Sequence, residues 1–407
     1  MNKFSQVIEV SGHLIDSLIL TKIFDVIMDL KGEFQVLEIK IGKRKKDTSY
    51  AKISVQARNQ KQLDEILEFV YRAGATAKLQ KAIKLKKATK NMLMPDNFYS
   101  TTNNQTQIFY RKKWINVENM MMDKCIVVNS RGARCVPIKD IKKFDKIVVG
   151  ETGVRVNPPE RPREGMNVFE FMGSSSSSER PTRHIAKRVA EDIYKTKKEK
   201  GKIIIVAGPA IVHTGASDSV AKLIHLGFID AVLAGNALAV HDIEYATLGT
   251  SLGMNVNDGT LAIRGHRNHM DAINSVFKAG SIANMVKTKK LKKGIMYECI
   301  KRKIPFVLAG SIRDDGPLPD VITDISVAQK KYKEILKDAK LVIMVATMLH
   351  SIATGNMLPA NVKVIVVDIN QPTVTKLMDR GTWQALGIVS DVGAFLPLVT
   401  HEIEKLK

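Results

Sequence analysis

Acidic and polar side chains follow short apolar runs at several places in the carboxyl-terminal half of this 407-residue chain. The apolar run 305–309 is followed by Gly310 and Ser311, and then by Asp314 and Asp315. Four other apolar runs end in small or polar residues in the same way: 203–207, 230–234, 341–346 and 362–367. Such runs are typical of buried parallel strands, whose carboxyl ends meet at one edge of a sheet. The sequence therefore predicts an α/β domain with a ligand site at that edge.

Three of these strand ends carry groups that suit a nucleotide. Asp368 directly follows the run 362–367, where a carboxylate can accept hydrogen bonds from both hydroxyls of a ribose. The segments 347–350 (TMLH) and 390–393 (SDVG) follow neighbouring apolar runs and would face the same crevice. We therefore predict a nucleotide site. The charge of Asp368 favours NAD over NADP, because a carboxylate would repel the 2′-phosphate.

Two glycine-led segments follow the first two apolar runs of this half. Residues 208–216 (GPAIVHTGA) match neither the G-x-G-x-x-G pattern nor a P-loop, although small residues let backbone amides approach an anion. Residues 235–244 (GNALAVHDIE) contain Asn236, whose amide could bridge ligand atoms, and His241 and Asp242 as a candidate acid/base pair. A simple turn and a capped helix with an exposed histidine explain the two segments equally well.

No metal site is expected. His266 and His269 are spaced to share one face of a helix, but no third ligand follows at a convincing spacing. The three cysteines form neither a Cys-x-x-Cys pair nor an even framework. This cysteine pattern, and a first segment that lacks the apolar core of a signal peptide, predict a cytoplasmic protein.

The chain is strongly basic, with a formal net charge of +22. Its lysines lie in short, dispersed runs, and aromatic residues, which make up only 6% of the chain, do not interleave with them. We therefore expect that the lysines form a solvated surface and that the protein has no nucleic-acid partner. The alternative is that the chain is a non-catalytic basic protein that is regulatory or binds nucleic acid. No apolar run is long enough to cross a membrane.

The pattern of elements predicts three regions. Residues 1–82 are predicted to form a ferredoxin-like α+β module, residues 83–170 a small β-rich region built as a barrel or sandwich, and residues 171–407 the parallel α/β domain. The first region follows the order strand, helix, strand, strand, helix, strand: 5–10, 16–30, 34–41, 50–57, 62–73 and 77–79. The expected strands of the second region are 107–110, 124–128, 134–138 and 146–149.

Several long segments resemble the archaeal-type ornithine cyclodeaminases, and the resemblance extends over nearly the whole chain. The segments that carry it are VFEFM (168–172) with the serines 174–178 and the ERP that follows, AGPAIVHTGA (207–216), AGNALAVHDIE (234–244), AGSIRDDGPLPDVITD (309–324) and VVDINQPTVTKLMDRG (366–381). The amino-terminal module of that family is also associated with lysine-oxoglutarate reductase/saccharopine dehydrogenase proteins. The carboxyl-terminal half of the family looks like the NAD-binding fold of deoxyhypusine synthase. The segment that carries the nucleophilic lysine of deoxyhypusine synthase is not found in this sequence, so that enzyme's reaction is not expected here.

The resemblance implies a reaction that converts L-ornithine to L-proline and ammonia with bound NAD. The cofactor would accept a hydride from Cα and return it after ring closure, so no net oxidation occurs and the site must exclude water from the imines. An NAD-dependent amino-acid dehydrogenase with net oxidation is the alternative. A homodimer or homotetramer is expected.

The resemblance also implies roles for individual residues. The following are expected to hold NAD: Asn236, Ala237, Asp314, Asp315, Thr347, Met348, Leu349, His350, Asp368, Asp391 and Val392. The following are expected to bind the carboxylate or the δ-ammonium group of the substrate: Arg180 or Arg183, and Asp242, Asp258 or Asp315. A base must remove a proton from a substrate amine, and His213 and His241 are equally good candidates.

Overall fold

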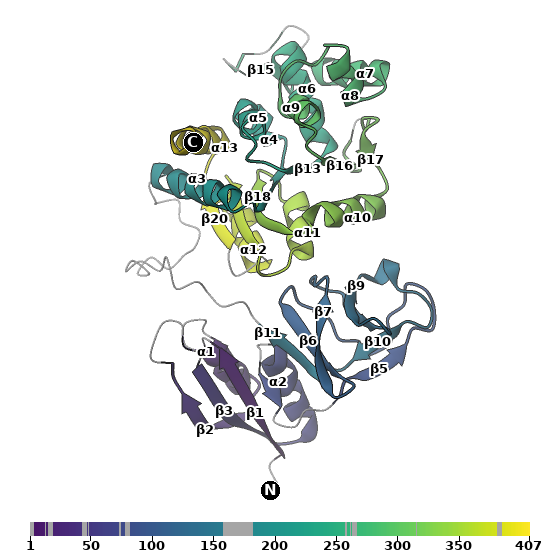
Figure 1. The fold of residues 1–407 in the computed structure, drawn as a ribbon, viewed down its shortest axis with the longest axis vertical. Coiled ribbons are helices and arrows are strands. Elements are labelled where there is room, and N and C mark those ends of the chain that lie inside the picture. The colour runs from purple at the N-terminus through teal and green to yellow at the C-terminus, as the bar shows by residue number, and fades with distance from the viewer. Residues whose placement is uncertain are drawn as a thin grey trace. The chain divides into compact units, whose positions relative to one another are not determined.

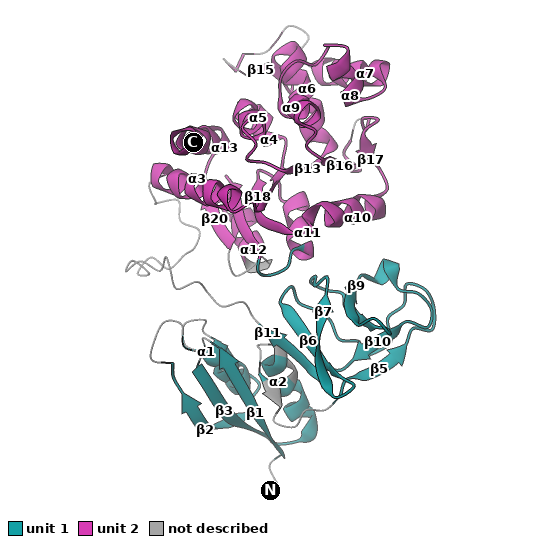
Figure 2. Ribbon diagram, viewed as in Figure 1, with its two compact units in different colours: residues 1–173, 358–361 teal, residues 174–357, 362–407 magenta. Residues whose placement is uncertain are grey.

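The computed structural model places most of the chain in two compact units (Figure 2). One unit contains residues 1–173 and 358–361, and the other contains residues 174–357 and 362–407. The structure describes the following residues: 4–12, 14, 19–42, 47, 49–72, 75–77, 82–157, 182–256, 259–260, 262, 267–314, 316–380 and 385–407.

The amino-terminal module of the first unit is a four-stranded antiparallel sheet with two helices (Figure 1). Its elements are β1 (Phe4–Gly12), α1 (Ile19–Asp29), β2 (Glu33–Lys40), β3 (Ser49–Ala57), α2 (Gln60–Arg72) and β4 (Thr76–Ala77). The sheet order β2-β3-β1-β4 confirms the predicted ferredoxin-like arrangement. Strict alternation in β3 buries every second side chain, including Ile53 and Val55, and these pack against apolar positions of α1 such as Ile23 and Ile27.

The rest of this unit is β-rich, as predicted. Its elements are β5 (Lys84–Lys87), β6 (Gln105–Tyr110), β7 (Lys113–Glu118), β8 (Cys125–Val128), β9 (Ala133–Val136), the short 3-10 helix η1 (Ile138–Asp140), β10 (Lys146–Val149) and β11 (Val154–Asn157). The strands form a seven-stranded sheet in the order β11-β6-β7-β9-β8-β10-β5. Two apolar clusters fill its interior, one around Ile108 and Ile126 and the other around Cys125 and Ile147.

The second unit is built on a seven-stranded parallel sheet, which confirms the predicted α/β class. Its strands are β12 (Lys202–Ala207), β13 (Ala231–Gly235), β16 (Phe306–Ala309), β17 (Val321–Ile322), β18 (Ala339–Val345), β19 (Lys363–Asp368) and β20 (Ala385–Val389). Their order is β17-β16-β13-β12-β18-β19-β20, with parallel pairing throughout. The chain winds outward from β12 in one direction and, after β18, in the other. The two central strands therefore mark a topological switch point, where open α/β sheets bind ligands.

Helices surround this sheet. They are α3 (Thr182–Lys198), α4 (Ala210–His213), α5 (Ser217–His225), α6 (Asn236–Leu248), α7 (Asn268–Ala279), α8 (Ile282–Lys287), α9 (Ile295–Arg302), α10 (Ile325–Leu336), α11 (Leu349–Met357), α12 (Gln371–Arg380) and α13 (Val392–Leu406). A small hairpin, β14 (Thr250–Ser251) with β15 (Met254–Asn255), follows α6. Helix α6 is buried around most of its circumference, so its polar residues must find partners inside the protein. Among the helices of the described residues, none is long and apolar enough to span a membrane.

Candidate active site

The two central strands come into backbone contact where they end. Gly208 N donates a hydrogen bond to Val345 O over 2.9 Å. A Cβ atom on Gly208 would lie 1.8 Å from Ala346 O, so no side chain fits at this position. Ala346 itself adopts a left-handed backbone with φ of 51°. The ends of β12 and β18 thus lie in contact, and the chain then leaves them in α4 and α11.

The start of α11 fits a phosphate group. The first backbone N–H groups of a helix have no partner within the helix, and the helix dipole attracts an anion to them. Met348 and Leu349 are exposed at this end, and Thr347 Oγ1 lies 3.3 Å from His350 Nδ1. In the first turn, the buried hydroxyl of Ser351 has no hydrogen-bond partner among the described residues. A phosphate oxygen or an ordered water would satisfy it.

Two predicted nucleotide-binding aspartates lie at neighbouring strand ends. Asp368, the last residue of β19, is half-buried, and its Oδ1 accepts a hydrogen bond from Asn370 N over 2.8 Å. Asp391 caps α13, because its Oδ1 accepts a hydrogen bond from Gly393 N over 2.7 Å. Val392 is only 3% exposed, so its side chain belongs to the core rather than to an open edge.

Residues after β13 and β16 line the same edge. Asn236 is buried, and its Oδ1 accepts a hydrogen bond from Leu318 N over 3.0 Å, so its amide fixes the loop that follows β16. The His350 ring packs against Gly235, where an added Cβ would lie 2.8 Å from Cε1. Burial lowers the pKa of His350 although the charge of Asp314 opposes this, so the ring is neutral near pH 7.

The two candidate bases meet across α4 and α6. The ring centroids of His213 and His241 are 4.7 Å apart in an edge-to-face arrangement. His213 Nδ1 lies 2.7 Å from Ser251 Oγ in the hairpin that follows α6. Burial, reinforced by the neighbouring His241, lowers the pKa of His213 to about 4, while Glu244 acts in the opposite direction. His213 is therefore neutral at neutral pH.

His241 is paired with Glu244, not with Asp242 as expected from the sequence. His241 Nδ1 lies 2.9 Å from Glu244 Oε2, and the Glu244 side chain is fully buried. Burial alone would raise the pKa of Glu244, but hydrogen bonds from His241, Gly253 and Thr250 outweigh it and hold the pKa below its ordinary value. The prediction missed Glu244, although its spacing of three residues from His241 on a helix was a usable signal.

Asp242 has a structural role in the described fold. Its carboxylate is completely buried and accepts hydrogen bonds from Ser217 Oγ over 2.6 Å, Ile295 N over 2.9 Å and Met296 N over 2.8 Å. The Asp242 carboxylate, which belongs to α6, therefore caps the amino terminus of α9. Burial raises its pKa, while these hydrogen bonds lower it. The Asp242 oxygens are thus engaged by these three donors, and His241 is paired with Glu244 instead.

Replacing Asp242 with alanine should destabilise the second unit. The substitution leaves buried donors on Ser217, Ile295 and Met296 without partners, and each such donor costs about 1–3 kcal/mol. We expect a loss of about 3 kcal/mol in the free energy of unfolding, measured by urea denaturation. Asp271→Ala, at an exposed position on α7, should change it by less than about 0.5 kcal/mol. Equal effects of the two substitutions would contradict the capping role.

The remaining predicted residues are not brought into the site by the described structure. Arg183 is exposed in the first turn of α3. Arg180, Asp258 and Asp315 lie outside the described residues, as do the serines 174–178. In the part of the chain that the structure describes, no group of three or more His, Cys, Asp or Glu residues could hold a metal ion.

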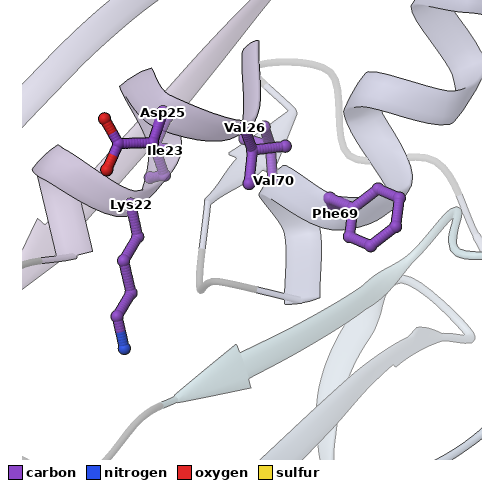
Figure 3. A pocket seen from close by; sticks show the side chains of 6 residues that line it. All are labelled: Lys22, Ile23, Asp25, Val26, Phe69 and Val70. Carbon is purple, nitrogen blue, oxygen red and sulfur yellow. The ribbon is translucent and has the colours of Figure 1, made fainter. Parts of the chain in front are cut away.

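A pocket of about 260 Å³ lies in the amino-terminal module, between α1 and α2 (Figure 3). Its walls are mostly apolar, from Ile23, Val26, Phe69 and Val70, and Figure 3 shows the charged end of Lys22 directed away from Phe69. It lacks a set of converging polar groups, so we assign the chemistry to the strand ends of the second unit.

The chain matches three protein families in succession. Residues 5–104 match the conserved region of the LOR/SDH bifunctional enzymes. Residues 105–186 match the first region of the carboxyl-terminal part of ArgZ-like arginine dihydrolases. Residues 187–399 match the Rossmann-fold region of the same proteins. The third match covers all seven strands of the parallel sheet.

Individual relatives align over the whole chain. The ornithine cyclodeaminase of Methanothermobacter thermautotrophicus is 54% identical, with 98% of each chain covered. The apo structure of ArgZ, an arginine dihydrolase from the cyanobacterial ornithine-ammonia cycle, is 37% identical with a TM-score of 0.86, and covers 99% of this chain and 59% of its own. The structure of AgrE in a ternary complex with ornithine and NAD+ is 39% identical with a TM-score of 0.55, and covers 100% of this chain and 58% of its own.

Proposed function

This chain belongs to the ornithine cyclodeaminase family, and from that premise we propose that it converts L-ornithine to L-proline and ammonia with NAD+ as a recycled cofactor. The observation that carries the proposal is the match, at 54% identity over 98% of both chains, to a relative named for this activity. It is supported by a second relative, solved with ornithine and NAD+, that aligns with all of this chain. The switch point between β12 and β18 offers the nucleotide a site of the expected kind.

The residues at the strand ends fit NAD. Gly208 lets the end of β12 pack against the Ala346 carbonyl, and the start of α11, where the Ser351 hydroxyl has no partner among the described residues, suits the pyrophosphate. Asp368 would accept hydrogen bonds from the ribose hydroxyls, and Oδ2 of this residue has no partner among the described residues. When bound, NAD+ supplies a hydride acceptor for Cα of ornithine and later the hydride that completes proline.

The protein's own groups hold the substrate and move protons. His213 or His241 takes the proton that an ornithine ammonium group must lose before its nitrogen can attack, and both rings lie on helices that leave the ligand edge of the sheet. Arg180 or Arg183 would bind the carboxylate bidentately. Asp258 or Asp315 would bind the δ-ammonium group. Asp242 no longer competes for that role, because its oxygens already accept three hydrogen bonds inside the protein.

Product analysis tests this function against the alternative of an amino-acid dehydrogenase. The purified protein is incubated with L-ornithine and NAD+, and proline, ammonia and NADH are measured together. We expect proline and ammonia in equal amounts, with no accumulation of NADH. NADH that accumulates in step with ornithine loss would instead support the dehydrogenase, and the proposed function would be wrong.

Replacing Asp368 with alanine should weaken NAD binding. The substitution removes hydrogen bonds from ribose hydroxyls to a charged acceptor, which are worth about 1.5–3 kcal/mol, so the Kd for NAD+ should rise roughly tenfold to a hundredfold. Isothermal titration of protein stripped of cofactor measures this. Glu334→Ala removes an exposed carboxylate from α10 and serves as the control. An unchanged Kd in Asp368→Ala would place the ribose elsewhere.

The cysteines and an exposed sheet edge support proposals for the location and the oligomeric state of the enzyme. We place it in the cytoplasm, because Cys125 and Cys299 are free thiols, as a reducing compartment favours. We also propose that it forms a homodimer or homotetramer without a nucleic-acid partner. The edge strand β2 exposes Val36 and Ile39, which a second copy of the chain could cover.

A further inference from the structure

Glu244 is a buried carboxylate that the proposed reaction does not yet use. Its side chain is fully buried in the third turn of α6. Oε1 accepts hydrogen bonds from Thr250 Oγ1 over 2.8 Å and from Gly253 N over 3.0 Å. Oε2 accepts one from Leu252 N over 3.2 Å and lies 2.9 Å from His241 Nδ1. A fully buried charge is retained only where it is completely satisfied.

These partners favour a proton on Nδ1 of His241. A backbone N–H can only donate, so Leu252 and Gly253 require oxygens that accept, as an ionised carboxylate provides. An ionised Glu244 has no proton to give, so the hydrogen in its bond to His241 must belong to Nδ1. In a neutral imidazole the other nitrogen, Nε2, then carries a lone pair. The geometry thus selects one of two tautomers.

Among the described residues, Glu244 is the charged group that contacts His241. From α4, the group that faces His241 is the His213 ring, which is neutral at neutral pH and bonded to Ser251. From α7, the neutral amide of Asn268 reaches the pair through Thr250, to whose Oγ1 it donates over 2.8 Å. Glu244, whose Oε2 lies 2.9 Å from Nδ1, is thus the carboxylate that can hold the His241 ring in one orientation.

From this arrangement we propose that Glu244 is a positioning residue, which holds the Nδ1–H of His241 so that Nε2 is the base that takes a proton from an ornithine ammonium group. The inference rests on the proposed function and deepens it, because it chooses His241 over His213 as the base. Glu244 touches no substrate in this role and acts only through His241. The competing explanation is that Glu244 merely fastens the β14–β15 hairpin through Thr250 and Gly253.

A double-mutant cycle separates the two explanations. In Glu244→Gln an amide NH₂ facing Nδ1 favours the opposite tautomer, and kcat for proline formation should fall about 100-fold or more. In the His241→Gln background the same substitution should cost little further, because its effect requires the imidazole. Losses that multiply in the double variant would overturn the proposal. Thr250→Val, which loosens the hairpin but keeps the carboxylate beside His241, should lower kcat far less than Glu244→Gln; an equal loss would favour the structural explanation.

A measurement on the unaltered protein decides the matter even if Glu244→Gln does not fold. Nitrogen-15 chemical shifts of histidine-labelled protein, assigned with His241→Gln, report which ring nitrogen carries hydrogen. We expect Nδ1–H and an unprotonated Nε2 on His241 at neutral pH; the reverse tautomer would overturn the proposal. Proline formation by the unaltered protein is measured first, so a failure of the proposed function is recognised separately.

Discussion

Replacing Gly208 with alanine is expected to abolish stable NAD binding and to lower the free energy of unfolding by about 3 kcal/mol. The added methyl group would lie 1.8 Å from Ala346 O, and the two nearest atoms belong to the Ala346 backbone, which cannot rotate away as a flexible side chain would. The strand ends must therefore separate at the place where the nucleotide is held. Native mass spectrometry and urea denaturation measure the two effects.

Gly355→Ala is a matched control for this substitution. Gly355 lies on α11, close in sequence to the same switch point, but an added Cβ would meet nothing within 4 Å. Alanine is favoured over glycine within a helix by about 1 kcal/mol, so this variant should be as stable as the unaltered protein or more stable. If Gly208→Ala behaved like Gly355→Ala, the backbone contact would not define the site.

Replacing His241 with glutamine should lower kcat by about 10²–10⁴-fold while NAD occupancy is retained. A positioned base contributes a factor of this size, and glutamine cannot take up the proton that leaves the substrate. Steady-state measurement of proline formation, with the cofactor quantified after denaturation, tests both statements. His401→Ala, at an exposed position on α13, serves as the control and should leave kcat unchanged. A His241→Gln variant with full activity would remove this ring from the mechanism.

Much of the fold could be predicted from the sequence because the spacing of apolar residues indicates which faces of a strand or helix are buried. Parallel strands such as β12 and β19 are buried on both faces and appear as continuous apolar runs, whereas β3 alternates because the helices cover one face of its sheet. The hairpin of β6 and β7 was missed for a physical reason. Its turn residues, Arg111 and Lys112, adopt positive φ angles of 53° and 63° without the glycine or asparagine that normally marks such a turn.

The candidate site was predictable only in part. Strand ends indicate where a ligand lies, and so Asp368 and the start of α11 could be located from the sequence. The partners of side chains on a buried helix cannot be read in the same way. Asp242 and Glu244 both lie near His241 in sequence, yet one is directed to the start of α9 and the other to the histidine. The packing of other elements around α6 decides which partner each carboxylate contacts, and the sequence of α6 alone does not indicate it.

The central claim is that one hydride is removed from ornithine and returned to the same carbon while the cofactor stays bound. Turnover of L-ornithine carrying deuterium at Cα tests it most directly, with the proline analysed by mass spectrometry and NMR. The account predicts proline that keeps the deuterium at C2, with no labelled NADH released to solution. Proline that carries solvent hydrogen at C2, or labelled NADH that accumulates without proline, would contradict it.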